Sequence, residues 1–127
     1  MDNQKISVIK QITFDAAHYL PEYNGLCKNM HGHTYKLEIG FQGIPDIKTG
    51  MIIDFNNIKT QLKWLKNKLD HTVLNNITDY NFPAHMPTAE NMVSWIRTIL
   101  QNKSIKDVEL SFIRLWETPT SYAEWRL

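Results

Sequence analysis

The alternation of apolar and polar positions along the chain predicts four β-strands and two α-helices. Strand segments are those in which every second residue is apolar, with polar residues between them. Four segments meet this description: residues 6–14, 33–42, 108–117 and 121–127. Apolar residues at helical spacing instead mark residues 55–69, after the candidate N-cap Asp54, and a second segment from Thr88 to about Leu100.

In chain order these segments are two strands, two helices and two strands. Hairpins at both ends favour an antiparallel sheet, and the helices between them supply a cover for one face. We therefore expect an α+β fold with a four-stranded antiparallel sheet and both helices on one face. Strict alternation in the third strand would place Leu110 and Phe112 together on the apolar face, opposite Glu109 and Ser111. The two open sheet edges favour pairing between subunits, so we also expect an oligomer.

Composition describes one ordinary globular domain spanning residues 1–127. The chain is 43% hydrophobic and 21% charged, without a repeat or low-complexity segment. A net charge of +1 and the lack of a basic run argue against a nucleic-acid-binding surface. One cysteine cannot form an intramolecular disulfide, and the N-terminal residues have no apolar signal-like core. Every apolar run is shorter than the ~20 residues of a membrane span. These features predict a cytoplasmic protein that binds neither membranes nor nucleic acids.

Four metal-binding side chains are concentrated in one short window. They are His18, Cys27, His31 and His33, and Cys27 is the only cysteine in the chain. On regular strands the three histidines would point to the apolar face and meet at one end of the sheet. Three imidazoles with an open fourth position suit a catalytic zinc ion. The spacing leaves two alternatives: a structural zinc with Cys27 as fourth ligand, and hydrogen-bonded histidines without a metal.

Two further motifs carry groups suited to act on a substrate. Asp70 and His71 follow the first helix, which would return them to the histidine end of the sheet if it packed antiparallel to the second strand. A general base is one interpretation of the pair, and a histidine stabilised at a helix C-terminus by the helix dipole is the other. Glu117 interrupts an apolar strand end beside Trp116. Its carboxylate could bind a flat, amine-bearing heterocycle through two hydrogen bonds, or be an ordinary solvated glutamate.

Six ordered segments of the sequence together resemble the 6-pyruvoyl-tetrahydropterin synthase family. They span most of the chain: residues 14–18 (FDAAH), 27–33 (CKNMHGH), 50–55 (GMIIDF), 69–71 (LDH), 87–91 (PTAEN) and 117–118 (ET). The spacing of three residues between Cys27 and His31 resembles that of the bacterial queuosine-pathway branch, the 6-carboxy-tetrahydropterin synthases, more than the usually longer spacing of the biopterin-making branch. Two details depart from familiar relatives, namely Trp116 before the glutamate and a long loop at residues 80–86.

The resemblance implies a tunnelling fold that assembles through its sheet edges, typically into a homohexamer with active sites at subunit interfaces. It implies zinc on the three histidines and Cys27 as the catalytic thiol. Asp70 and His71 would be the proton-relay partners of Cys27, supplied by the same or a neighbouring chain. Glu117 would anchor the pterin ring, and Thr88 and Glu90 would help to line the pterin pocket.

The resemblance also implies a reaction in queuosine (7-deazapurine) biosynthesis. A zinc-dependent lyase of this kind converts 7,8-dihydroneopterin triphosphate to 6-carboxy-5,6,7,8-tetrahydropterin, acetaldehyde and triphosphate, without a nicotinamide or flavin. Two alternatives stay open. The first is elimination of triphosphate alone, as in 6-pyruvoyl-tetrahydropterin synthase itself. The second is a non-catalytic, zinc-stabilised module that binds a pterin or a partner protein.

Overall fold

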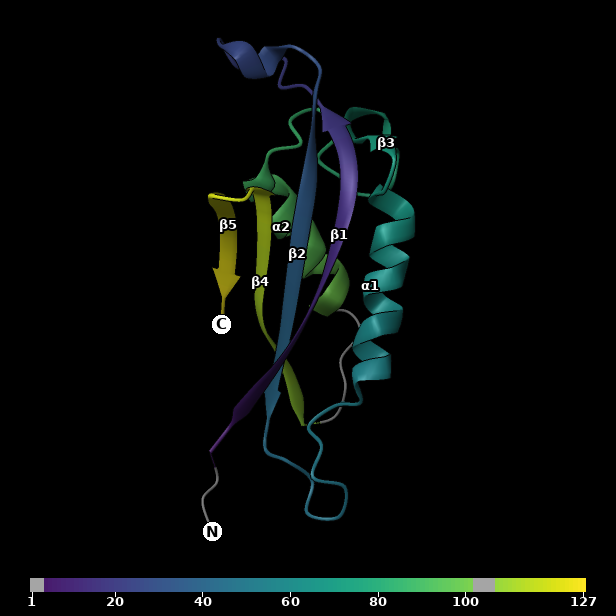
Figure 1. Cartoon of the computed structure of the whole chain (residues 1–127), viewed down its shortest axis with the longest axis vertical. Helices are drawn as coiled ribbons and strands as arrows, with labels where there is room; N and C mark the ends of the chain where they lie inside the picture. Colours follow the sequence, from purple (N-terminus) through teal and green to yellow (C-terminus); the bar gives the residue numbers. More distant parts are fainter. Residues whose placement is uncertain (1–3, 102–106) are drawn as a thin grey trace.

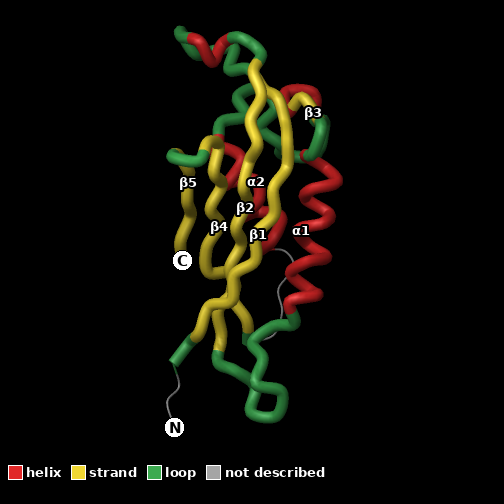
Figure 2. Tube along the Cα trace, in the orientation of Figure 1, coloured by secondary structure: helices red, strands yellow, loops and turns green. Residues whose placement is uncertain are grey.

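The structure is a computed structural model that describes residues 4–101 and 107–127, and it consists of a five-stranded sheet with two helices on one face (Figure 1 and Figure 2). No helix in these ranges is long and apolar enough to cross a membrane. The strands are β1 (Ile6–His18), β2 (His31–Gly43), β3 (Thr72–Val73), β4 (Val108–Thr118) and β5 (Ser121–Arg126). The helices are α1 (Phe55–Leu69) and α2 (Ala89–Gln101), with short 3-10 turns η1 (Leu26–Lys28) and η2 (Leu74–Asn76).

The sheet is mixed rather than purely antiparallel. Its strand order is β3-β1-β2-β4-β5, and β3 pairs parallel with β1 at Ala16–Thr72 and Ala17–Val73, whereas the other pairs are antiparallel. The expected four-stranded antiparallel sheet is therefore wrong by one strand, and the element order is ββαβαββ. A two-residue strand is too short to show an alternating pattern, so its pairing depends on where α1 delivers the chain.

Both N-terminal strands extend further than the apolar alternation predicts. β1 continues to His18 instead of ending at residue 14, and β2 begins at His31 instead of residue 33. Antiparallel pairing persists to these last residues, with His18 opposite His31 and Ala16 opposite His33. Histidines interrupt the apolar pattern, but the backbone ladder does not depend on side-chain type. The extra length places all three histidines on the paired ends of β1 and β2.

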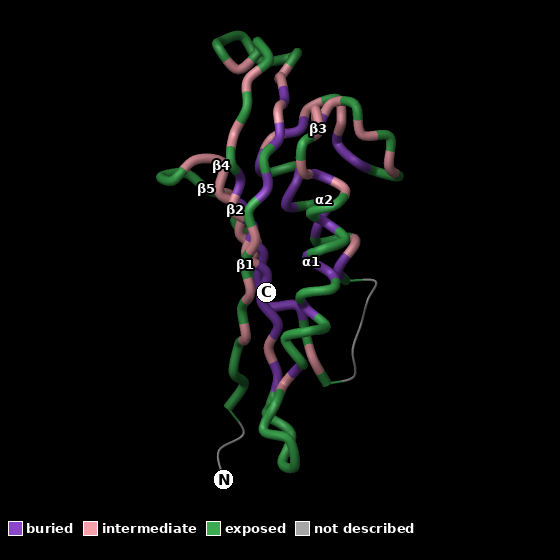
Figure 3. The backbone as a smooth tube through the Cα atoms, turned by 45° about the vertical axis from the view of Figure 1, so that its right-hand side comes forward, coloured by how far each residue is buried: buried purple, intermediate pink, exposed green. Residues whose placement is uncertain are grey.

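Both helices pack on the same face of the sheet. α1 lies against β1, and α2 lies against β4 and β5. Asp54 caps α1 as predicted, because its carboxylate accepts the backbone N–H of Asn56 at 2.8 Å. Figure 3 shows the buried positions concentrated where the sheet and the helices face each other. The helices thus cover the face toward which the histidines were expected to point.

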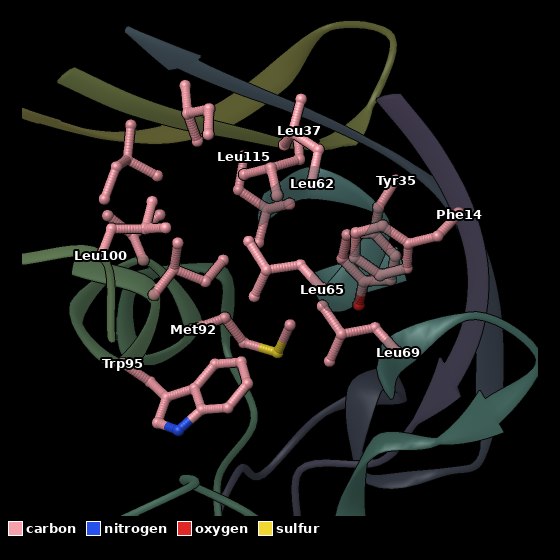
Figure 4. Packing of buried hydrophobic residues seen from close by; sticks show 14 of the residues in the cluster. Phe14, Tyr35, Leu37, Leu62, Leu65, Leu69, Met92, Trp95, Leu100 and Leu115 are labelled. Atoms are coloured by element: carbon pink, nitrogen blue, oxygen red, sulfur yellow. The ribbon is translucent and has the colours of Figure 1, made fainter. Parts of the chain in front are cut away.

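The core reaches the histidine end of the sheet through an aromatic pair. Figure 4 shows the stacked rings of Phe14 and Tyr35. Their centroids are 4.9 Å apart, and Leu69 of α1 is fully buried in the same cluster. Tyr35 follows His33 by two residues on β2, so both side chains leave the same face of the strand. The buried aromatic pair therefore packs next to the histidines, between them and the rest of the core.

A β-bulge in β4 changes which of its residues face the helices. The pairing shifts between Gly40, which is opposite Phe112, and Phe41, which is opposite Leu110. β4 therefore contributes one extra residue at this point, and its side-chain alternation is reset. A Cβ atom on Gly40 would lie 2.6 Å from the ring of Phe112, so the glycine makes room for that ring.

The bulge places the second half of β4 in the opposite phase from the one that alternation predicts. Phe112 leaves the face of Leu110, and its ring instead lies beneath the guanidinium of Arg114, 5.5 Å from the ring centroid. The expectation that Phe112 shares the apolar face is wrong for this reason. Ile113 and Leu115 are fully buried against the helices instead, and Glu117 shares their face.

Candidate active site

Three histidines, His18, His31 and His33, meet where β1 ends and β2 begins. Figure 1 shows this end of the sheet. The potential ligand nitrogens of the histidines lie within 4.8 Å of one another, and Nε2 of His18 is 3.1 Å from Nε2 of His31. His18 is fully buried, and the other two are partly buried. The convergence predicted from strand parity is therefore present in the structure.

Backbone carbonyls fix the orientation of two of these rings. Nδ1 of His18 donates to the carbonyl oxygen of Pro87 at 2.8 Å, and Nδ1 of His31 donates to that of Asn29 at 2.7 Å. Because a carbonyl can only accept, each Nδ1 carries the ring proton and each Nε2 has a lone pair. Two such lone pairs at 3.1 Å repel each other unless a cation lies between them. Ligating histidines have this arrangement, with the second ring nitrogen held by the protein.

His33 supplies the third nitrogen. Its Nε2 atom is buried and has no hydrogen-bond partner among the described residues. An unpaired buried polar atom is costly, and a metal ion held by the three rings would satisfy it. Burial lowers the pKa of both His18 and His33, which keeps these rings neutral near pH 7 and available as ligands. The residues present therefore fit a metal ion with three nitrogen ligands.

Tyr35 separates the histidines from the rest of the core. Its ring centroid is 5.5 Å from that of His33 and 6.2 Å from that of His18. Burial raises the pKa of Tyr35, so its hydroxyl remains protonated at ordinary pH. The buried, neutral phenol therefore lies between the histidines and the hydrophobic core.

Glu117 lies beside the histidines. Its Oε1 is 3.4 Å from Nε2 of His18 and 3.6 Å from Nε2 of His33, and the side chain is 31% exposed. A solvated strand-end glutamate, the simpler interpretation of the sequence, does not describe this position. A cavity of about 530 Å³ is lined by both Glu117 and His33. Its partial exposure leaves the carboxylate available to a ligand that reaches the histidines.

Cys27 lies on the loop between β1 and β2, which projects beyond the histidine end of the sheet (Figure 1). Its carbonyl accepts the backbone N–H of Leu20 at 2.8 Å, so this bond holds Cys27 against a residue that follows His18 by two positions. In the described part of the chain, the donor atoms that gather within 4.8 Å belong to the histidines and do not include the Cys27 sulfur. The geometry favours a free thiol over a fourth metal ligand.

Asp70 and His71 make a direct contact that neighbouring residues on a regular helix could not make. α1 ends at Leu69, Asp70 is its C-cap, and His71 has a left-handed backbone with a φ of 58°. This turn brings Nδ1 of His71 within 2.9 Å of the Asp70 carboxylate. β1 holds the pair through the backbone of Asp15. Its N–H donates to the Asp70 carboxylate at 2.8 Å, and its carbonyl oxygen accepts the backbone N–H of His71 at 2.6 Å.

These hydrogen bonds also set the charge of the pair. The backbone N–H of Asp15 and the contact with His71 lower the pKa of Asp70, which stays ionised at neutral pH. His71 and His33 both border an open depression of the surface, and the His71 side chain is 79% exposed. α1 therefore returns the pair to the histidine end of the same chain, as the antiparallel packing of the helix requires. The relay role of the pair stays a prediction.

The predicted pocket residues Thr88 and Glu90 stand at the start of α2. Thr88 caps the helix as expected, because its hydroxyl accepts the backbone N–H of Asn91 at 3.1 Å. Glu90 is exposed in the first turn. Pro87, which holds His18, directly precedes this turn. The pocket-lining role of Thr88 and Glu90 stays a prediction.

Sequence reasoning missed three residues that support the site: Asp15, Asn29 and Pro87. Each acts through a backbone N–H or carbonyl, and every residue type except proline carries both groups. Side-chain identity therefore gives no signal for these roles. Only the paired strands and the placement of α2 show which backbone atoms reach the functional side chains.

Comparison with known proteins gives matches over nearly the whole chain. A family model described as 6-pyruvoyl tetrahydropterin synthase matches residues 7–127. A 6-carboxy-5,6,7,8-tetrahydropterin synthase of Haemophilus influenzae is 32% identical, with 94% of this chain and 97% of that protein covered. A dihydroneopterin monophosphate aldolase of Pyrococcus furiosus is 34% identical, with 89% and 90% covered.

Solved structures agree on the fold. The 6-pyruvoyl tetrahydropterin synthase of Caenorhabditis elegans superposes with a TM-score of 0.85 over 98% of this chain and 96% of its own, at 23% identity. Likeness at that identity supports the α+β architecture and nothing further. The family match and the relatives above 30% identity add what the fold alone does not: this chain belongs to the 6-pyruvoyl tetrahydropterin synthase family.

Proposed function

We propose that this protein is a zinc-dependent lyase that converts 7,8-dihydroneopterin triphosphate to 6-carboxy-5,6,7,8-tetrahydropterin, acetaldehyde and triphosphate in queuosine biosynthesis. The observation that carries the proposal is the convergence of three histidine nitrogens beside Glu117, with the Cys27 thiol outside the donor cluster. Similarity to the 6-carboxy-5,6,7,8-tetrahydropterin synthase of Haemophilus influenzae supports the choice of product.

Zinc suits this donor set in both chemistry and size. Catalytic zinc sites use three protein ligands and keep a fourth position open. Zinc–nitrogen distances of ~2.0–2.1 Å in a tetrahedron separate the ligand nitrogens by about 3.3–3.4 Å. The 3.1 Å between the Nε2 atoms of His18 and His31 is close to that separation, and the ligand atoms of all three histidines lie within 4.8 Å of one another.

The groups of the chain divide the work of the reaction. When bound, zinc would supply Lewis acidity that lowers the pKa of the substrate's side-chain hydroxyls. Cys27, as thiolate, removes the proton from the first side-chain carbon, and the electron pair moves into the ring imine. Glu117 accepts hydrogen bonds from the ring's amine side and fixes its orientation. Thr88 and Glu90 line the pterin pocket.

Asp70 and His71 move the protons that the chemistry consumes and releases. The ionised Asp70 holds Nδ1–H of His71, which leaves Nε2 as the atom that accepts and returns a proton. The hydrogen bonds of the pair with the backbone of Asp15 hold it near the end of β1 that carries His18, which supports transfer within one chain. A pair from a neighbouring chain would serve equally if the site forms between subunits.

We also propose a homohexamer with active sites at subunit interfaces. The sheet ends in two edge strands, β3 and β5, whose outer edges are unpaired in a single chain. The loop that carries Cys27 exposes apolar side chains, with Leu26 88% exposed and Met30 55% exposed. Clustered apolar exposure of this kind is typical of contact surfaces.

The deciding experiment incubates purified protein with 7,8-dihydroneopterin triphosphate and identifies the products by mass, with acetaldehyde measured separately. We expect 6-carboxy-5,6,7,8-tetrahydropterin and stoichiometric acetaldehyde. A pyruvoyl product without acetaldehyde would identify the elimination reaction instead. No consumption of any pterin would favour the non-catalytic module. Similarity to the Pyrococcus aldolase makes dihydroneopterin monophosphate the second substrate to assay.

Cys27→Ala separates the catalytic thiol from a structural one. The variant should keep zinc and lose turnover, because the histidines hold the metal without the sulfur. Loss of zinc together with turnover would support Cys27 as a ligand. Alkylation of the wild-type thiol, slowed by bound substrate, provides an independent check on the same residue.

A further inference from the structure

We infer that Asn75 is a positioning residue that holds the base of the Cys27 loop (residues 19–30) against the end of β1. The side-chain amide of Asn75 binds the backbone of Tyr19, which directly follows His18. The catalytic importance of the thiol rests on the proposed function, whereas the hold of Asn75 on the loop does not. The two can therefore fail separately.

Asn75 makes two hydrogen bonds to one residue that is 56 positions away. Its Oδ1 accepts the backbone N–H of Tyr19 at 3.0 Å, and its Nδ2 donates to the Tyr19 carbonyl oxygen at 2.8 Å. A side-chain amide carries the same kinds of donor and acceptor as a peptide group. Asn75 therefore binds Tyr19 much as a residue of a neighbouring strand would.

This contact continues a series along the edge of β1 that faces away from β2. The backbone of Asp15 bonds with the Asp70–His71 pair on this edge, and β3 pairs next along the strand, as Figure 1 shows. Backbone pairing ends where the chain turns from β3 into η2. The side chain of Asn75 then supplies the following contact, so one segment of the chain holds both the relay pair and the exit of β1.

The turn η2 fixes Asn75 in place for this role. Leu74, the first residue of the turn, is fully buried in the core, and its carbonyl oxygen accepts the backbone N–H of Ile77 at 3.1 Å. Asn75 and Tyr19 are both partly buried. Loss of the amide would leave two partly shielded backbone groups of Tyr19 without their partner, which is unfavourable.

Tyr19 connects this contact to the thiol. The residue after it, Leu20, donates its N–H to the carbonyl oxygen of Cys27 at 2.8 Å. Most of the loop has little packing of its own, because residues 21–26 and 28–30 are exposed. A segment with few buried contacts opens easily unless its ends are held. Asn75 holds the end at β1, and the bond from His31 to the Asn29 carbonyl holds the end at β2.

The test compares Asn75→Ala with Asn76→Ala, a change at the exposed neighbour in the same turn. Amide hydrogen exchange of each full-length protein is followed by peptide-resolved mass spectrometry. We expect residues 19–27 to exchange roughly tenfold faster or more in Asn75→Ala, the usual net effect of two hydrogen bonds, and to keep the wild-type rate in Asn76→Ala.

A segment of the central strand β2, residues 35–39, reports general loss of stability in the same experiment. Its exchange should stay at the wild-type rate in both variants. An equal acceleration of residues 19–27 and 35–39 would show a merely structural role and overturn the inference. Asn75→Leu, which keeps a branched side chain and removes both hydrogen bonds, gives the same readout if Asn75→Ala does not fold.

Alkylation provides a second readout, because Cys27 is the only cysteine and its side chain is partly buried. Its rate of reaction with iodoacetamide should rise roughly tenfold in Asn75→Ala as the loop opens more often. Metal content should equal that of the wild type, since the ligand cluster consists of the three histidines. An equal or slower alkylation rate in Asn75→Ala than in Asn76→Ala would overturn the inference.

A kinetic arm tests the consequence for turnover of dihydroneopterin triphosphate. Asn75→Ala should lower kcat by roughly tenfold or more, because a small misplacement of a reacting group is costly. KM should change much less, since the amide of Asn75 is bonded to the backbone of Tyr19 and not to the candidate pocket residues. A change confined to KM would contradict a role in placing the thiol.

The outcomes separate this inference from the proposed function. Faster exchange and alkylation in Asn75→Ala, without turnover of any pterin by the wild type, would keep the positioning role and reject the proposed reaction. Turnover by the wild type, with the same exchange and alkylation rates in Asn75→Ala and Asn76→Ala, would keep the reaction and reject the positioning role.

Discussion

The carbonyl oxygen of Pro87 lies 2.8 Å from Nδ1 of His18 and joins the start of α2 to the end of β1. The bond assigns the ring proton of a fully buried histidine to one nitrogen and directs the other toward His31. A residue 69 positions away thus determines which atom of His18 is a ligand. The metal-binding geometry is therefore a property of the folded domain, although its three donors lie close together in sequence.

The first prediction concerns metal content. Wild-type protein should hold one zinc per chain, and His33→Asn should lose it, because three donors become two. Loss of an outer hydrogen-bond partner alone typically weakens metal affinity by roughly 10–100-fold, so removal of a ligand should exceed that range. Elemental analysis after dialysis measures the stoichiometry. His85→Asn, a change at an exposed histidine outside the cluster, should retain full zinc. Stoichiometric zinc in His33→Asn would contradict the assignment.

The second prediction concerns the pH dependence of stability in the metal-free protein. Burial lowers the pKa of His18 and His33 below the value of 6.5 that applies in the unfolded chain. The unfolded state therefore takes up protons first as the pH falls, and the free energy of unfolding should decrease below about pH 6.5. Urea unfolding between pH 8 and pH 5 measures this change.

Two comparisons isolate the histidines in that experiment. Asp70 does not interfere, since its lowered pKa makes its contribution decline only below its ordinary value of 3.8. His33→Asn should show a flatter pH profile than the wild type because one of the titrating rings is gone. Stability that rises as the pH falls from 7 to 5 would be incompatible with neutral, buried rings.

The third prediction concerns the Asp70–His71 pair. Asp70→Asn should lower kcat by roughly 100-fold or more, the usual contribution of general acid–base catalysis, because the charge that orients Nδ1–H of His71 is lost. KM should change much less, since the pair does not hold the ring. Steady-state kinetics across a pH series provides the measurement. Asp79→Asn, at a surface ion pair with Lys68, is the matched control and should keep its activity. Equal kinetics for Asp70→Asn and the control would exclude the relay role.

The fourth prediction concerns the bulge that orients Glu117. Gly40→Ala should destabilise the fold by about 1–3 kcal/mol, the usual cost of overpacking, because its Cβ would lie 2.6 Å from the ring of Phe112. Gly32→Ala is the control, since its Cβ would meet only the Ala16 carbonyl at 3.7 Å, an ordinary contact. Chemical unfolding of both variants measures the difference. Similar stabilities for the two would mean that the ring of Phe112 moves aside without cost.

Several features of this protein could be predicted from local pattern alone. α1 has the bounds that its apolar stripe predicts, and Asp54 caps it through the expected hydrogen bond. The parity of β1 and β2 correctly brings three histidines to one face. Helical and strand periodicity are set by neighbouring residues, so a single sequence contains the information needed for these predictions.

Other features depended on contacts between distant segments. Strict alternation in β4 assigns Phe112 to the apolar face, but the bulge opposite Gly40 reverses the phase and puts Glu117 beside the histidines. β3 exists as a strand because α1 ends beside β1, and the left-handed turn at His71 brings that residue to Asp70. No local pattern marks these events, since each is decided by which backbone groups find partners across the sheet.

The sequence by itself determined which donor types are present, the strands and helices that carry most of them, and the face on which the histidines lie. The tertiary structure decided their chemical state: which nitrogen of His18 is free, whether Glu117 faces the cluster, and what holds Asp70 ionised. The physical reason is the distance along the chain over which each effect acts. Side-chain periodicity follows from neighbouring residues, whereas proton positions and charges depend on burial and on hydrogen-bond partners that only folding brings together.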